Sequence, residues 1–300
     1  MTKQLKADLS LLSVTAIWGS SFALMKIVLD HMPTFAYLSL RFIIASVVLV
    51  IIFHRKLKNL NRKVLLCGCG IGLLLFGGMA LQVGGLNYTT ASNSAFITGL
   101  NVVFVPIVST ILLKRKPDKS SVIGVALAFG GLFFLTGGIN FRFNIGDLLT
   151  FLCAVSFTFH IVAQAKYTRE YSPELLVMVQ LVLSAVLYTG VWFAADNKPV
   201  QINPSVVWIL IITAVFATAV AFGVQTFAQK YTSPTHTALI LTAEPVFGAV
   251  FAMIIPNSQG VTESLKLNSI VGCSLILIGM LISEFRIGKK KAAAETTAEF

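Results

Sequence analysis

Three ionisable side chains lie deep inside long apolar stretches of this sequence. The first, Arg41, lies about seven residues, or roughly 10 Å, inside an apolar stretch that begins near residue 34. A guanidinium at that depth could bind a substrate carboxylate through two parallel hydrogen bonds, or it could tie helix ends together through backbone carbonyls. Both interpretations of Arg41 are consistent with the sequence.

Glu244 lies about nine residues into another apolar stretch, which places it close to the middle of a membrane-spanning segment. It is followed directly by Pro245, which removes one backbone donor and frees a carbonyl one turn earlier. The result is a kink and a polar spot beside the carboxylate. Glu244 could therefore carry a coupling proton, bind a substrate amine, or serve as a structural partner of a neighbouring hydroxyl.

His160 lies about six residues from the end of a third apolar stretch and shares a helix face with Phe157. Histidine titrates near neutral pH and suits proton transfer, although a lone histidine is also an ordinary packing residue. None of these residues belongs to a catalytic motif, because the sequence contains no HExxH, GxSxG or phosphate-binding loop. We therefore expect a protein that is not an enzyme and needs no metal or other cofactor.

The elements that hold these residues are predicted to be membrane helices. Hydrophobic residues make up 56% of the 300 residues and charged residues 12%, about half of the roughly 25% found in soluble domains. A helix needs about 20 apolar residues to cross a bilayer. Ten such stretches are present, at 8–29, 34–53, 64–87, 91–113, 120–138, 145–166, 173–194, 204–229, 235–256 and 267–287. The prediction is an all-α polytopic membrane protein with ten transmembrane helices.

The positive charge indicates the orientation of these helices. The formal charge of +11 could, as a sum, indicate nucleic-acid binding. Sorted by position, however, eighteen of the 23 Lys and Arg residues fall in one alternating set of loops and termini, and three fall in the other. Because cytoplasmic loops carry the Lys and Arg excess, both termini are predicted to be cytoplasmic. Spread over short loops, this charge argues against a nucleic-acid partner.

The second half of the sequence repeats the first. Ordered matches occur at offsets of 139, 143 and then 148 residues, and they include Asp8 with Asp147, Arg41 with Gln180, Asn101 with Glu244, Gly124 with Gly272, and Gly131 with Gly279. Five spans in each half is an odd number, so the two halves must be inverted relative to each other. We predict two inverted five-helix repeats around a central cavity, at 1–138 and 145–287, followed by a basic and then polar cytoplasmic tail at 288–300.

These residues also carry a family resemblance that covers nearly the whole chain. The first half shows Trp18-Gly19-Ser20-Ser21-Phe22, Arg41-Phe42 and the run from Ala91 to Leu100, and the second shows Gly146-Asp147-Leu148-Leu149 and Ala243-Glu244-Pro245-Val246-Phe247. In this order and spacing, the sequence resembles an EamA-type member of the drug/metabolite transporter superfamily. The resemblance implies a central substrate cavity and alternating access.

In that family the third, fourth, sixth and ninth helices are among those that wall the cavity. The resemblance therefore implies that the substrate-contacting residues include Met79 and Gln82 in the third helix, Phe96 in the fourth, Phe157 and His160 in the sixth, and Glu244 in the ninth. Trp18 adds aromatic surface, Arg41 is the buried cation, and Asn101 is the repeat partner of Glu244. These nine residues form the predicted substrate-binding set.

The function expected from these observations is that of a secondary transporter in the cell membrane. Family members move amino acids, other metabolites, nucleosides or drugs, often outward, so we expect an exporter of small metabolites such as amino acids. A facilitator or importer of nucleosides, drugs or other metabolites is the alternative, and an intramembrane enzyme is a further one. The expected partners are the small-molecule substrate and the lipid bilayer. Proton coupling, and the choice between monomer and homodimer, stay open.

Overall fold

A computed structural model describes residues 2–86, 88–89, 91–114, 116–136, 144–195, 199–254 and 266–296; within them, the side chains of residues 22, 23, 26, 86, 91–93, 252 and 284–296 are not described. The elements are α1 (Lys3–Leu29), α2 (Thr34–Phe53), the 3-10 turn η1 (His54–Asn59), α3 (Arg62–Leu86), α4 (Ala91–Gly99), α5 (Asn101–Leu113), α6 (Lys119–Leu135), α7 (Ile145–Tyr167), α8 (Pro173–Ala195), α9 (Pro204–Ala214), the π-helical turn η2 (Val215–Val220), α10 (Ala221–Ala228), α11 (Pro234–Leu241), α12 (Glu244–Ile254) and α13 (Leu267–Thr296). The described part of the chain contains no β-strand.

Each of the ten predicted stretches coincides with one helix or with consecutive helices. The largest differences are at the ends, because α1 begins five residues before residue 8 and α13 runs nine residues beyond residue 287. Within the described ranges, six helical segments are long and apolar enough to cross a membrane. The chain is therefore an all-helical, multi-pass membrane protein. The last residues of the predicted tail, 297–300, and the loops at 137–143 and 255–265 lie outside the described residues.

Local sequence signals set several helix starts. Thr2, Asp118, Asn144, Asn203 and Ser233 each precede a helix, and the side chain of each accepts a hydrogen bond from the backbone N–H three residues later. Such caps satisfy donors that have no partner inside the helix. They explain why the predicted and observed starts of α6, α7, α9 and α11 agree to within one residue.

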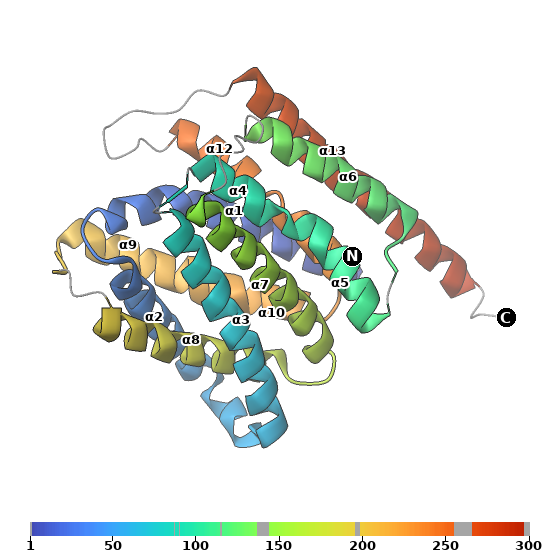
Figure 1. The fold of residues 1–300 in the computed structure, drawn as a ribbon. Helices are drawn as coiled ribbons and strands as arrows, with labels where there is room; N and C mark the ends of the chain where they lie inside the picture. Colours follow the sequence, from blue (N-terminus) through green and yellow to red (C-terminus); the bar gives the residue numbers. More distant parts are fainter. Residues whose placement is uncertain are drawn as a thin grey trace.

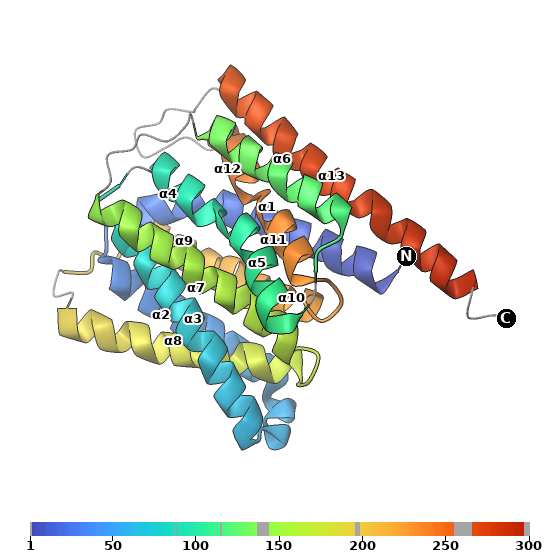
Figure 2. The same ribbon diagram turned by 45° about the vertical axis from the view of Figure 1, so that its right-hand side comes forward.

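Helices α6 and α13 lie side by side along one flank of the molecule (Figures 1 and 2). Their contact is made by glycines: a Cβ at Gly124 would lie 2.6 Å from the carbonyl oxygen of Gly279, and one at Gly131 would lie 2.7 Å from that of Gly272. The contact is reciprocal. A Cβ at Gly279 would lie 2.6 Å from the Gly124 carbonyl oxygen, and one at Gly272 would lie 2.6 Å from that of Gly131. The order of these pairs makes the two helices antiparallel, with backbone against backbone.

Two of the apolar segments are interrupted near their middle. In the fourth segment, Leu100 separates α4 from α5, and its N–H donates to Ile97 O (3.2 Å). In the ninth segment, Ala243 precedes α12, and its N–H donates to Ile240 O (3.0 Å). Both turns are tighter than an α-helical turn, because the bond spans three residues instead of four. As a result, Asn101 and Glu244 each open the second half of a broken helix.

The eighth segment contains a different irregularity. Between α9 and α10 the chain makes the π-helical turn η2, which inserts one extra residue into the helix. This turn packs against α1 and α2. It brings one backbone oxygen, Ala217 O, and one side-chain oxygen, Thr218 Oγ1, within reach of polar side chains from those helices.

Candidate functional site

Arg41 holds the π-helical turn from the side of α2. Its Nε donates to Thr218 Oγ1 (2.5 Å), its Nη2 to Ala217 O (3.0 Å) and its Nη1 to Tyr37 Oη (3.4 Å). Its guanidinium carbon also lies 5.7 Å from the centre of the Tyr37 ring. With only 4% of its surface exposed, Arg41 has all three nitrogens on neutral protein acceptors. This geometry favours the interpretation in which Arg41 ties helices together through a backbone carbonyl.

Trp18 of α1 reaches the same carbonyl and begins a chain of aromatic contacts. Its Nε1 donates to Ala217 O (2.9 Å), and its ring centre lies 5.2 Å from that of Phe222 on α10. The Phe222 ring lies 6.3 Å from His160, and His160 lies 6.5 Å from Phe157. Four of the nine predicted residues, Trp18, Arg41, Phe157 and His160, are thus brought into one group, joined through Ala217 and Phe222.

His160 belongs to a buried polar cluster formed with Gln164, Gln180 and Thr226. The His160 Nε2–H donates to Gln180 Oε1 (3.0 Å), and Gln164 Nε2 donates to the same oxygen (3.1 Å) and to Thr226 Oγ1 (3.2 Å). Gln180 Nε2 also donates to Thr226 Oγ1 (3.2 Å), which in turn donates to Phe222 O (2.6 Å). The tautomer of His160 is assigned from this pattern, because Gln180 Oε1 can only accept. No side chain of this cluster is more than 1% exposed.

Glu244 occupies the first turn of α12, a helix that packs against α1. A Cβ at Gly19 of α1 would lie 2.8 Å from the Glu244 carbonyl oxygen, so the two backbones touch next to Trp18. The Glu244 carboxylate lies within electrostatic range of the Cys153 thiol on α7, one turn before Phe157. Glu244 is half-buried as a residue, and among the described residues its carboxyl group accepts no hydrogen bond and forms no ion pair. It is an ionisable group without a hydrogen-bond or ion-pair partner among these residues.

The remaining four predicted residues lie in different surroundings. Met79 is half-buried in the same core as Trp18 and Phe157. Gln82 is half-buried on the α3 face that packs against α7, one turn from Gly78, where a Cβ would lie 2.7 Å from Phe157 Cε1. Asn101 is half-buried at the start of α5.

Phe96, by contrast, points into a separate apolar cluster. It is 4% exposed and packs with Val246 and Leu132. Its ring also lies 5.8 Å from Phe129 and 6.4 Å from Phe133, both on α6. This position attaches α4 to α6 and does not join the group around Trp18 and His160.

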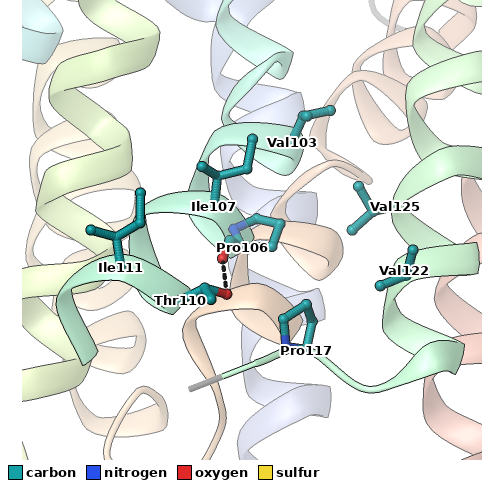
Figure 3. A pocket seen from close by; sticks show the side chains of 8 residues that line it. All are labelled: Val103, Pro106, Ile107, Thr110, Ile111, Pro117, Val122 and Val125. Atoms are coloured by element: carbon teal, nitrogen blue, oxygen red, sulfur yellow. Dashed lines mark hydrogen bonds between the residues drawn. The ribbon is translucent and has the colours of Figure 1, made fainter. Parts of the chain in front are cut away.

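Two apolar grooves lie on the outside of the helix bundle. One, of about 440 Å³, runs between α5 and α6 (Figure 3), where valine and isoleucine side chains and Pro106 and Pro117 form the walls, and its single hydroxyl, Thr110, donates to Pro106 O (2.7 Å). The other, of about 500 Å³, runs between α2 and α8. None of the nine predicted residues lines either groove.

Sequence reasoning did not select three members of the polar cluster, Gln164, Gln180 and Thr226. Two signals were available: Gln164 is one turn from His160, and Gln180 is the repeat match of Arg41. It also did not select two polar contacts near helix ends. His236 Nε2 lies 3.7 Å from Asp8 Oδ2, and Thr89 Oγ1 donates to Asp147 Oδ1 (2.5 Å). Asp8 and Asp147 are themselves a repeat pair.

The chain is similar to known proteins over most of its length. The chain is 38% identical over 285 residues to an uncharacterized transporter of Archaeoglobus fulgidus, covering 95% of this chain and 88% of that protein. It is 24% identical to a probable amino-acid metabolite efflux pump of Escherichia coli, covering 94% and 95%. A solved crystal structure matches with a TM-score of 0.80 and 18% identity over 93% of this chain and 98% of that one, which shows a shared fold.

A family model gives the most direct assignment. The model of the EamA-like transporter family matches this chain twice, at residues 5–137 and 144–285. The two matches together span both halves of the chain and contain all nine predicted residues. The protein therefore belongs to the EamA-like transporter family.

Proposed function

We propose that this protein is a secondary transporter that exports small metabolites such as amino acids by alternating access. The observation that carries the proposal is the pair of broken helices, in which Asn101 and Glu244, a predicted repeat pair, each begin the second half of the helix. In secondary transporters, substrate and coupling-ion sites are typically built where helices of inverted repeats are interrupted near the membrane midplane. The Escherichia coli relative named as an amino-acid metabolite efflux pump supports the substrate class.

The architecture proposed with this function is that of ten transmembrane helices in two inverted repeats, 1–138 and 145–287, around a central cavity. Support comes from the reciprocal glycine contacts of α6 and α13, which are repeat partners. The groove between α2 and α8 supports the same symmetry, because eight of its wall residues form four pairs at the sequence offset that joins Arg41 to Gln180: Ile43 with Val182, Ser46 with Ala185, Val47 with Val186, and Val50 with Thr189. The double match of one family model adds further support.

We propose that the protein lies in the cell membrane with both termini in the cytoplasm. The start of α1 and the end of α13 lie toward the same end of the molecule in both views (Figures 1 and 2), as an even number of crossings requires. A cysteine-free background carrying single cysteines at Lys116 or at Gln201 tests the orientation. An impermeant maleimide added to intact cells should label the variant at 201 and leave the variant at 116 unlabelled. The reverse pattern would invert the orientation.

Transport itself is tested with purified protein in liposomes loaded with unlabelled metabolites. Addition of the labelled compound outside should produce transient accumulation, because exchange through a shared site needs no energy source. A metabolite library is first screened for thermal stabilisation of the detergent-purified protein, since a ligand that binds the folded state raises its stability. Absence of exchange for a broad panel, in protein shown to be folded, would overturn the proposal.

Coupling is tested with two variants. If His160 or Glu244 carries a proton, His160→Ala or Glu244→Gln should abolish the dependence of transport on a pH gradient while substrate binding persists. The measurement is uptake into liposomes at fixed substrate concentration with and without an imposed gradient. An unchanged gradient dependence in both variants would assign coupling to other residues, and no dependence in the wild type would define a facilitator or exchanger.

A further inference from the structure

We infer that the transported substrate carries a positively charged amine that binds the Glu244 carboxylate. The inference rests on the proposed transport function and specifies the chemical class of the substrate. The inference follows from comparing the ionisable side chains deep inside the described helices. Some of them already bind other protein groups, and one does not.

Glu244 is the ionisable side chain that is available to bind a ligand. A carboxylate inside a membrane protein is costly unless a partner compensates it. Its location in the first turn of α12 supplies only partial compensation from the helix dipole. Among the described residues it has no hydrogen-bond donor and no ion-pair partner, and the residue as a whole is half-buried. A ligand ammonium group would provide the missing counter-charge.

Arg41, the opposite charge, is not available in the same way. Its guanidinium is 4% exposed and is committed to Thr218, Ala217 and Tyr37. His160 is likewise 1% exposed and hydrogen-bonded to Gln180. A substrate that carries only a carboxylate therefore meets no accessible cation among the described side chains deep in the helices, whereas a substrate with an amine meets Glu244.

The surroundings of Glu244 suit a cation as well. Trp18 directly precedes Gly19, whose backbone touches that of Glu244, and Phe157 lies one turn from Cys153 on α7. Both aromatic side chains are half-buried rather than closed off. Aromatic rings attract ammonium groups, because the face of the ring carries partial negative charge. The geometry thus combines one unpaired carboxylate with nearby aromatic surface.

The test uses sets of compounds that share a side chain and differ in whether they carry the amine, the carboxylate or both. Each set contains an amino acid, the amine left after loss of its carboxylate, and the carboxylic acid left after loss of its amine: leucine, isoamylamine and 4-methylpentanoate, and likewise phenylalanine, phenethylamine and 3-phenylpropionate. Further sets extend the range of side chains. Binding is measured as thermal stabilisation, and transport as counterflow in liposomes. We expect the amine and the amino acid of at least one set to bind, and the acid of that set to bind at least tenfold more weakly.

Two substitutions locate the effect. Glu244→Gln should reduce amine affinity at least tenfold, and Glu244→Asp should restore part of it, which guards against a variant that fails to fold. Glu174→Gln is the matched control, because this carboxylate lies in the first turn of α8 and pairs with Lys56 (3.6 Å). Its loss should leave amine binding unchanged.

Several outcomes would overturn the inference. These are equal binding of acid and amine, failure of every set while neutral sugars or nucleosides are transported, and full amine affinity in Glu244→Gln with loss of pH-gradient dependence, which would make Glu244 a proton carrier. In each of these cases transport itself would persist. Absence of any transport by folded protein would instead overturn the proposed function.

Discussion

The third and eighth membrane segments are both 25 residues long, yet they are held in place differently. The third, α3, is one uninterrupted helix that approaches α7 and α8 through glycines; a Cβ at Gly72 would lie 3.0 Å from the backbone of Gln180. The eighth contains the π-helical turn, which Arg41 and Trp18 hold by side-chain hydrogen bonds. Side-chain hydrogen bonds also reach α3, from Ser156 Oγ to Leu74 O (2.8 Å) and from Tyr188 Oη to Phe76 O (3.1 Å), but they join a regular helix whose glycine contacts do not depend on them. The π-helical turn is an irregular backbone held by side chains, and it can be freed when those side chains move. The eighth segment is therefore the better candidate for rearrangement during transport.

The strongest test of this comparison is Gly72→Val in α3. The added side chain would overlap the α8 backbone, and overpacking of this kind costs typically about 1–3 kcal/mol, here expected at the upper end. Thermal unfolding monitored by fluorescence-detected size exclusion measures the effect. Gly70→Val is the matched control, since a Cβ at Gly70 meets nothing within 4 Å. Equal losses in the two variants would show that β-branching, rather than helix contact, is responsible.

Arg41→Lys tests the eighth segment. Lysine keeps the positive charge but cannot contact Thr218 and Ala217 together, and hydrogen bonds from charged groups contribute about 1.5–3 kcal/mol each. We expect a loss of about 2 kcal/mol in stability and faster hydrogen exchange confined to residues 213–222. Trp18→Phe keeps the aromatic contact with Phe222 and should cost less, about 1 kcal/mol. A uniform increase in hydrogen exchange across α3 would contradict the role of Arg41 and Trp18 in holding the π-helical turn.

The polar cluster offers a smaller and more local test. In Thr226→Val the amides of Gln164 and Gln180 lose a shared acceptor, which is expected to cost about 1–2 kcal/mol. Thr158→Val is the control, because the hydroxyl of this equally buried threonine bonds only Ala154 O in its own helix (2.8 Å). Chemical denaturation of the two variants under identical conditions gives the comparison. A loss as large in Thr158→Val would remove any special role for the cluster.

The smallest predicted effect is a gain in the stability of the folded protein. Gly223 lies in α10, just after the π-helical turn, and a Cβ there meets nothing within 4 Å. Gly223→Ala should therefore stabilise the folded protein by about 0.5–1 kcal/mol through helix propensity alone. Slower transport in this more stable variant would indicate that flexibility at the turn is used. Destabilisation would indicate that a neighbouring segment closes on this position.

The sequence predicted the helices well because their signals are local. Long apolar runs bounded by Asn, Asp, Ser or Pro identify a membrane helix and its start without reference to the rest of the chain, as at Asn144 and Ser233. The site was harder to predict, because partners decide it. Nothing near Arg41 in the sequence indicates that Thr218 and Ala217 will face it, since the π-helical turn that presents them has no sequence signature. The same holds for Gln180 and Thr226, which acquire their roles only when α8 and α10 meet.

The glycine contacts between α6 and α13 have a mechanical consequence. Helices that meet backbone to backbone, as at Gly131 and Gly272, cannot slide past each other without collision. The second contact, at Gly124 and Gly279, lies about two turns away, so α6 and α13 are held against each other along their length as one pair that joins the two halves of the chain. In the alternating access proposed above, this pair would move as a single body.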